Sequence, residues 1–234
     1  MAYYFHSCTS TQSIARQICP TCPDFSLVKC DRQSAGRGRH NRTWVSPDNG
    51  NLYFSLIFQP GIPLVYYPLY NFIMALAIID VTAEYTLSAY LKWPNDVMVQ
   101  GRKISGILSS HHQRKLIVGV GFNLRLEPEQ MAAIAKPAVS LYELTDARPD
   151  RNRILERILF YFKQRIHILE DYQTDRLVSL FQQVGYKLDD MVRIHVGHEI
   201  KRIRIKGINP MGRLLAEDEQ GHSIEIISGE LIDE

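Results

Sequence analysis

The stretch Tyr90-Leu91-Lys92-Trp93-Pro94-Asn95-Asp96-Val97-Met98-Val99-Gln100-Gly101-Arg102-Lys103-Ile104-Ser105-Gly106 sets the fold class of this chain. Its aromatic and β-branched runs are typical of strands. Pro94 ends the first strand, and Gln100-Gly101-Arg102 makes a tight turn between two others. With the apolar run that follows, the stretch predicts a four-stranded meander over 90–93, 97–100, 104–111 and 116–124.

Helical patterns flank the meander. Residues 52–58 predict one further strand, which stops at Pro60-Gly61. The apolar segment around 68–85 contains Asp80 and Glu84, so it predicts a buried helix and is too short and too polar to span a bilayer. We therefore expect an α+β core with helices over 10–19, which Ser10 or Thr11 would cap, 68–85, 150–172 and 174–184.

The pattern changes after Gly185. Short alternating strands follow, separated by turn residues, and they predict a small C-terminal β-barrel. We place a catalytic domain at 1–184 and the barrel domain at 185–234. The basic run 201–206 alternates with isoleucine, which favours one solvated and one buried strand face over a nucleic-acid patch. The predicted barrel strands cover 192–196, 200–208, 213–217 and 223–227.

Composition narrows the classes of function. The 234 residues fit one substantial domain with an appendage, and 27 basic against 25 acidic residues leave a net charge of +2. Such a small net charge does not favour nucleic acid or an anionic membrane as a partner. The chain starts without the pattern of a secretory signal, so we expect a cytoplasmic location.

Four cysteines occur at positions 8, 19, 22 and 30, and Cys19-Pro20-Thr21-Cys22 has the spacing of a redox or zinc pair. A second pair at matching spacing is missing. Free thiols are the favoured interpretation for such a chain, and a redox-sensitive dithiol and a four-cysteine zinc site are the alternatives.

Residues 36–46 form the first candidate site. Gly36-Arg37-Gly38-Arg39-His40-Asn41-Arg42-Thr43-Trp44-Val45-Ser46 combines three guanidiniums with glycines and an indole. Glycine lets the main chain approach a ligand, and arginine offers planar donors that match phosphate or carboxylate oxygens. A phosphorylated small ligand is the favoured interpretation. A solvated surface loop and a segment that binds single-stranded nucleic acid are the alternatives.

Three further segments carry candidate chemistry. Residues 92–96 present Asn95 and Asp96 at a junction between strands, although such a turn is often only structural. Lys103 follows the hairpin turn and either meets an anion or snorkels into water. In the segment Gly119-Val120-Gly121-Phe122-Asn123, the two glycines leave one face of the strand without side chains. This pattern indicates either the close approach of a ligand or another backbone, or a packing bulge.

In this order, the arginine loop, Lys-Trp-Pro-Asn-Asp, Lys-x-x-Gly and Gly-x-Gly-x-Asn closely resemble the biotin protein ligases. The resemblance also includes Ser10-Thr11-Gln12 and residues 33–39, and it runs over the whole length. It implies a class II synthetase-like fold with a mixed central sheet flanked by helices. It also implies ATP-dependent transfer of biotin to one lysine of a biotin carrier protein through biotinyl-5′-adenylate, with Mg²⁺ neutralising the pyrophosphate.

The resemblance also implies roles for individual residues. Lys103, Arg39 and Asp96 would be catalytic, with Asp96 orienting or deprotonating the carrier lysine; a metal-linked or structural role for Asp96 is the alternative. No metal ligand is assigned. The biotin site would comprise Ser10, Thr11, Gln12, Gln33, Gly36, Arg37, Gly38, Arg39, Lys103 and Gly106. The nucleotide site would comprise Arg37, Arg39, Arg42, Trp44, Asn95, Lys103 and Asn123.

The sequence also predicts how this chain differs from other members of the family and how it assembles. Asn41 stands where the family commonly has glycine, and asparagine tolerates left-handed backbone geometry better than most residues. Ser10 begins the catalytic region almost at once, so we expect a monofunctional ligase that does not bind DNA. A sheet edge could pair two subunits into a homodimer. The rival hypotheses are a lipoate or octanoate ligase of related fold and a nucleic-acid-binding regulator.

Overall fold

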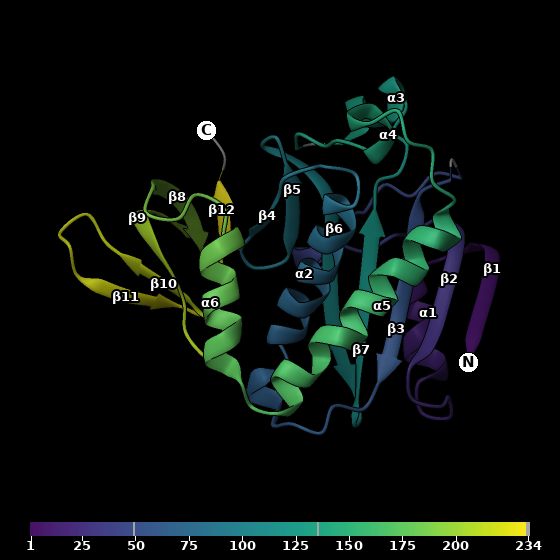
Figure 1. Cartoon of the computed structure of the whole chain (residues 1–234), viewed down its shortest axis with the longest axis horizontal. Helices are drawn as coiled ribbons and strands as arrows, with labels where there is room; N and C mark the ends of the chain where they lie inside the picture. The colour runs from purple at the N-terminus through teal and green to yellow at the C-terminus, as the bar shows by residue number, and fades with distance from the viewer. Residues whose placement is uncertain (49, 135, 233–234) are drawn as a thin grey trace.

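A large mixed β-sheet forms the centre of the molecule. The computed structural model describes residues 1–48, 50–134 and 136–232. The order in the sheet is β1-β2-β3-β7-β6-β5-β4, with β1 parallel to β2 and all other neighbours antiparallel. Figure 1 shows it as a twisted layer behind α2 and α5. The strands are β1 (Ala2–Cys8), β2 (Ser26–Gln33), β3 (Leu52–Phe58), β4 (Ala89–Lys92), β5 (Asp96–Val99), β6 (Arg102–His112) and β7 (Lys115–Phe122).

The predicted meander is confirmed. Strands β4 to β7 are consecutive antiparallel neighbours, and their bounds differ from the predicted ones by at most two residues. The turn between β5 and β6 has positive φ at both Gln100 (51°) and Gly101 (73°), as a two-residue hairpin with the twist of its strands requires. Asp96 is the first residue of β5, so the segment 92–96 does present it where two strands meet.

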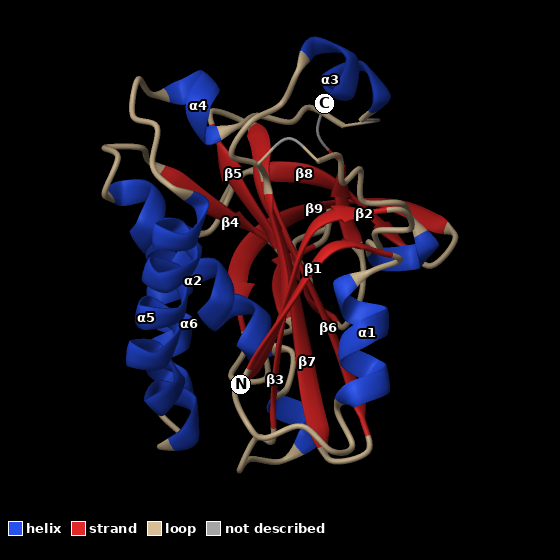
Figure 2. Ribbon diagram, turned by 90° about the vertical axis from the view of Figure 1, so that its right-hand side faces the viewer, coloured by secondary structure: helices blue, strands red, loops and turns tan. Residues whose placement is uncertain are grey.

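Helices cover both faces of this sheet (Figure 2). Helix α1 packs on one face, where Ala15 and two cysteines meet Val28, Ile57 and Ile117. Helices α2 and α5 cover the other face, and α6 packs beside them. The helices are α1 (Thr11–Ile18), α2 (Leu69–Ala83), α3 (Pro128–Ala133), α4 (Leu141–Leu144), α5 (Arg151–Glu170) and α6 (Thr174–Val184), with 3-10 turns η1 (Arg39–Asn41) and η2 (Leu64–Tyr66).

Helix α2 is the central core helix. Residues Leu64–Ala83 are long and apolar enough to cross a membrane by length and composition alone, so the expectation that this segment is too short and too polar to do so is wrong. Eleven residues of α2 are buried, and Asp80 receives a bidentate ion pair from Arg165 on α5 at 2.7 and 2.8 Å. Apolar residues all round a helix are expected when it is buried between layers. The predicted buried helix is therefore confirmed.

The C-terminal residues form a second, antiparallel sheet. Its order is β11-β10-β9-β8-β12, so β11 and β12 are its edges. The prediction of a closed barrel is not confirmed, because among the described strands these two edges do not pair and the sheet stays open. Edge strands of three and four residues offer few ladder bonds for closure. The strands are β8 (Met191–Val196), β9 (Glu199–Ile208), β10 (Leu214–Glu217), β11 (Ser223–Ile226) and β12 (Glu230–Ile232).

This second sheet is joined to the first by specific contacts. The indole N–H of buried Trp93 donates to the carbonyl of Gly212 (3.1 Å). The amide of Tyr186 donates to the carbonyl of Leu91 (2.9 Å), which extends the β4 edge. These contacts hold the second sheet beside β4, with β12 on the side facing the large sheet (Figure 1).

The sequence analysis missed strands β1, β2 and β12. Strand β1 lies at the edge of the sheet, where Tyr4 and His6 are exposed. Its residues therefore do not show the clear alternation of apolar and polar side chains that identifies a half-buried strand. On β2 the charged residues Lys29, Asp31 and Arg32 obscure the pattern, although Asp31 is buried against Arg151 (2.6 Å). Strand β12 has three residues, too few for any periodicity to register.

Candidate active site

A cavity of about 340 Å³ lies between the arginine loop, the N-terminus of α1 and strands β5 to β7. All of the predicted site residues line it except Gly36 and Asn123. Gly36 lines a second hollow, together with other residues of the same loop, Leu108 and Ser228. Segments far apart in the sequence thus meet at one place.

One end of the cavity is a closed network of neutral polar side chains. The Gln33 Oε1 accepts from the Thr11 amide (2.8 Å) and hydroxyl (3.3 Å), and the Ser55 hydroxyl donates to the Thr11 Oγ1 (3.0 Å). Gln12 donates to the carbonyl of Leu108 at 2.5 Å. Ser10 occupies the N-cap position of α1 by its backbone, yet its side chain makes no capping hydrogen bond. This end is preorganised for a neutral polar ligand group.

The arginine loop folds back on itself. The Trp44 amide donates to the Gly36 carbonyl (2.9 Å), and the Gly38 amide donates to the Arg42 carbonyl (2.8 Å). A Cβ on Gly36 would lie 2.4 Å from the Trp44 carbonyl oxygen, so this position requires glycine for close packing. The left-handed residues of the loop are His40 (φ 53°) and Asn41 (φ 58°) rather than the glycines.

The glycines of β6 and β7 receive side chains of the site itself. A Cβ on Gly121 would lie 2.3 Å from the Trp44 ring, and one on Gly106 would lie 2.8 Å from it. A Cβ on Gly119 would lie 2.5 Å from the Gln12 amide nitrogen. The pairing of β7 with β3 and β6 runs without a register shift, so the packing bulge is wrong. The groups that approach the strand closely are side chains of the site, not another backbone, and approach by a ligand stays a prediction.

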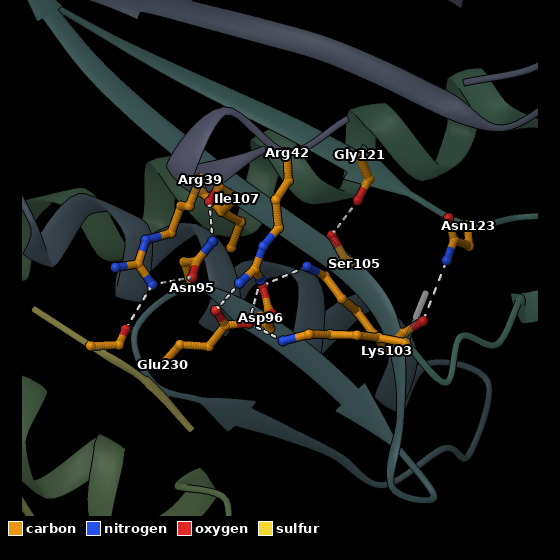
Figure 3. Close-up of polar contacts among 12 residues, drawn as sticks. Arg39, Arg42, Asn95, Asp96, Lys103, Ser105, Ile107, Gly121, Asn123 and Glu230 are labelled. Carbon is orange, nitrogen blue, oxygen red and sulfur yellow. Dashed lines mark hydrogen bonds and ion pairs between the residues drawn. The ribbon is translucent and has the colours of Figure 1, made fainter. Parts of the chain in front are cut away.

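Charged groups gather at the opposite end of the cavity (Figure 3). The ammonium of Lys103 pairs with the Asp96 carboxylate at 2.7 Å and lies 5.0 Å from the centre of the Trp44 ring. Arg39 donates to the Asn95 amide oxygen (3.4 Å) and to the carbonyl of Gly229 (3.1 Å). Burial, reinforced by repulsion from a neighbouring arginine, lowers the pKa of Arg39, and a guanidinium still keeps its charge at any pH of interest.

Two residues of this end were missed by the sequence analysis. The carboxylate of Glu230, from β12, accepts hydrogen bonds from the two terminal guanidinium nitrogens of Arg42, each at 2.5 Å, and also pairs with Lys136. Glu230 lies in a short strand of the second sheet, and Lys136 lies in the connection after α3. Neither belongs to a motif, so no sequence signal would have found them.

The charge balance of the cavity favours an anion. Its lining has two carboxylates, Asp96 and Glu230, and five side chains that are cationic at neutral pH, which leaves a surplus of three positive charges. Cations that exceed their partners in a concave, partly buried site attract a polyanionic ligand. The five cations are Arg37, Arg39, Arg42, Lys103 and Lys136.

Asn123 lies behind this end and outside the cavity. It is buried, and its amide donates to the carbonyls of Lys103 (3.3 Å) and Val139 (3.2 Å). The side chain therefore ties the start of β6 to the chain after α3. A direct contact of Asn123 with a nucleotide stays a prediction.

The cysteines are all free, and three of them are buried. Within the part of the chain that the structure describes, no three His, Cys, Asp or Glu side chains come together as a metal site. Cys19 and Cys22 pack under α1 with apolar neighbours. Their arrangement agrees with the free-thiol interpretation.

Fold and cavity together suit an enzyme that activates a carboxylic acid with a nucleotide, because one cavity offers neutral polar groups beside a surplus of cations. The profile of the biotin/lipoate A/B protein ligase family matches residues 6–126, more than half of the chain. The chain belongs to this family.

Individual relatives agree with this assignment. The biotin–[acetyl-CoA-carboxylase] ligase of Mycobacterium tuberculosis is 29% identical over 231 residues, covering 96% of this chain and 85% of that protein. The bifunctional ligase/repressor BirA of Bacillus subtilis is 29% identical over 229 residues, covering 93% and 70%. Among solved structures, the biotin protein ligase from Aquifex aeolicus in complex with biotin and ATP superposes with a TM-score of 0.84 at 28% identity, covering 99% of this chain and 97% of that one.

Proposed function

We propose that this protein ligates biotin to a specific lysine of a biotin carrier protein, using ATP and passing through biotinyl-5′-adenylate. The observation that carries the proposal is one cavity that joins a neutral polar end to a cationic end. Biotin has a ureido ring at one end and a carboxylate at the other. The cavity offers matching partners for both ends within one enclosure.

The ureido ring would lie at the polar end. Its carbonyl and N–H groups would engage Ser10, Thr11, Gln12 and Gln33. The Gln33 side chain is already held by hydrogen bonds with the Thr11 amide and the Ser46 hydroxyl, and that of Gln12 by the Leu108 carbonyl. Ile107, Leu108 and Val120 also line the cavity and would hold the apolar ring. The glycines of the arginine loop would bring its backbone close to the valeryl chain and carboxylate.

The first step must bring two anions together. Each unit-charge pair at about 4 Å repels by about 4 kcal/mol at an effective dielectric near 20. Arg37 and Arg39 would clamp the biotin carboxylate and the α-phosphate, and Lys103 would bridge the reacting groups and stabilise the charge of the transition state. Because Lys103 pairs with Asp96 before ligands bind, it is already held in the cavity. Trp44 would offer its ring face to the adenine, and Asn95 would orient a phosphate.

Mg²⁺ fits the site as a companion of ATP. This cation is usually held by one or two carboxylates together with substrate phosphates. The two carboxylates of the cavity, Asp96 and Glu230, both lie at the cationic end, and the described residues form no ready-made cage. Bound there, Mg²⁺ would neutralise the departing pyrophosphate.

The second step needs a neutral amine. The carrier lysine is an ammonium at neutral pH and must lose a proton to attack the adenylate. Once Lys103 engages the adenylate, the Asp96 carboxylate is released to orient this ammonium or accept its proton. A structural role for Asp96 as the partner of Lys103 is the alternative.

The adenylate must be shielded from water between the two steps. Arg39 links the arginine loop to Asn95 and to the Gly229 carbonyl of the second sheet, so it would hold the cover in place. We assign residues 1–184 to the catalytic domain and 185–234 to a domain that completes its wall, of which 233–234 lie outside the described residues. A cytoplasmic location and a homodimer stay predictions from the sequence.

The test is incubation of the purified protein with ATP, Mg²⁺, biotin and an apo biotin carrier domain, followed by mass measurement of the carrier. We expect a mass gain of one biotinyl group, together with biotin-dependent pyrophosphate exchange. Lipoate replaces biotin in a parallel reaction. Exchange with lipoate and none with biotin would refute the proposal in favour of the lipoate ligase hypothesis.

A further inference from the structure

Lys136 has no role in the function proposed so far, although it belongs to the cavity wall. Its position is fixed by the backbone beside it. The Lys103 amide donates to the Pro137 carbonyl (2.9 Å), and the Val139 amide donates to the Lys103 carbonyl (3.0 Å). Residues 137–139 thus run alongside the start of strand β6. Lys136, just before them, lines the cavity together with Lys103.

The surroundings of Lys136 are unfavourable to a cation unless an anion is near. Partial burial, followed by repulsion from Arg42, Lys92 and Lys103, lowers the pKa of Lys136. Its described ion-pair partner is Glu230, which also holds Arg42 in a bidentate pair. One carboxylate therefore bridges two cations that come from separate segments, as a phosphate group would.

We propose that Lys136 is a further phosphate-binding residue, that with Arg42 it takes the β- and γ-phosphates of ATP, and that Glu230 holds both cations in place until the nucleotide arrives. The inference rests on the proposed ligase function. A triphosphate offers three or more oxygens to the same cations and would take over the contacts of the single carboxylate.

Exposure assigns Lys136 to the leaving pyrophosphate rather than to the α-phosphate. The side chains of Lys136 and Arg42 are 44% and 54% exposed, whereas that of Lys103 is 23% exposed. The reacting carboxylate and α-phosphate belong at the inner cation, where water is excluded. Lys136 and Arg42 form the outer rim, from which pyrophosphate can leave to solvent.

The experiment compares the wild type with Lys136→Gln, Lys136→Arg and the matched control Lys201→Gln. Lys201 is a half-exposed lysine of the second sheet that pairs with Glu199, away from the cavity. We expect Lys136→Gln to raise the KM for ATP, and the KM for pyrophosphate in the exchange reaction, by about tenfold, the usual effect of losing one charged hydrogen bond. Lys136→Arg should restore both values, and Lys201→Gln should change neither.

A merely structural role would give a different pattern. If Lys136 only tied the second sheet to the catalytic domain, Lys136→Gln would lower the melting temperature and weaken biotin binding along with ATP binding. We expect instead an unchanged biotin Kd and an unchanged rate of transfer from preformed biotinyl-5′-adenylate to the carrier. An unchanged KM for pyrophosphate in Lys136→Gln would overturn the inference. Absence of exchange in the wild type would overturn the ligase function itself.

Discussion

Gly119 and Gly121 provide a test that separates the two substrates within one strand. Both lie in β7, two residues apart on the face toward the cavity. A Cβ on Gly121 would lie 2.3 Å from Cε2 and 2.4 Å from Nε1 of Trp44. A Cβ on Gly119 would lie 2.5 Å from the side-chain nitrogen of Gln12. Alanine at either position therefore displaces one of the two side chains to which we assign a substrate and leaves the other untouched.

The magnitude follows from the overlap. Carbon atoms pack at about 3.5–4.0 Å, so the Trp44 ring must move by more than about 1 Å in Gly121→Ala. Overpacking of this kind costs about 1–3 kcal/mol. Where that cost falls on binding, affinity changes by about 5-fold to 150-fold, because 1.4 kcal/mol corresponds to a factor of about ten. In Gly119→Ala the displaced Gln12 loses its hydrogen bond to the Leu108 carbonyl.

The assay measures the KM values of ATP and biotin in pyrophosphate exchange and the melting temperature of each variant. Gly121→Ala should raise the KM for ATP and change that for biotin by less than about threefold, and Gly119→Ala should do the reverse. Gly61→Ala is the control, because a Cβ there meets nothing within 4 Å. Equal effects of the two β7 variants on both substrates, or no effect on either, would refute the assignment of Trp44 to ATP and Gln12 to biotin.

Three other perturbations test the charged end of the cavity. Lys103→Ala should abolish biotin-dependent pyrophosphate exchange, and residual exchange above about one tenth of the wild-type rate would contradict a catalytic role. Arg39→Gly removes the contacts to Asn95 and Gly229 and should release adenylate that labels lysines of bystander proteins; carrier-only labelling at the normal rate would show that Arg39 does not shield the intermediate. Because the pKa of Lys136 is lowered, the alkaline fall of kcat/KM for ATP should begin below the usual lysine range near 10.4, and Lys136→Arg should move it upward; coincident profiles would exclude Lys136 as the titrating group.

Local patterns in the sequence were sufficient for most of the core. The runs at 52–58 and 90–124 gave strands β3 to β7, because hydrophobic alternation and the turn at Gln100-Gly101 act over a few residues. The helices α2, α5 and α6 were predicted for the same reason. The family resemblance likewise depends on short ordered motifs that need no structure to be found.

Other features could not follow from local patterns. The glycines of the arginine loop looked like its flexible points, yet the left-handed residues are His40 and Asn41, and Gly36 is needed because Trp44 passes close by. The predicted barrel is an open sheet, because pairing between edge strands depends on their lengths and on what packs beside them.

The sequence by itself determined the α+β class, the antiparallel meander and the motifs that identify a biotin-type ligase, since each depends on residues close together in the chain. Only the tertiary structure decided that β12 reaches the cavity, that Glu230 bridges Arg42 and Lys136, and that Trp44 occupies the space above Gly106 and Gly121. These contacts join residues up to 188 positions apart. No local pattern encodes such pairings, because they arise only when the sheets and helices pack together.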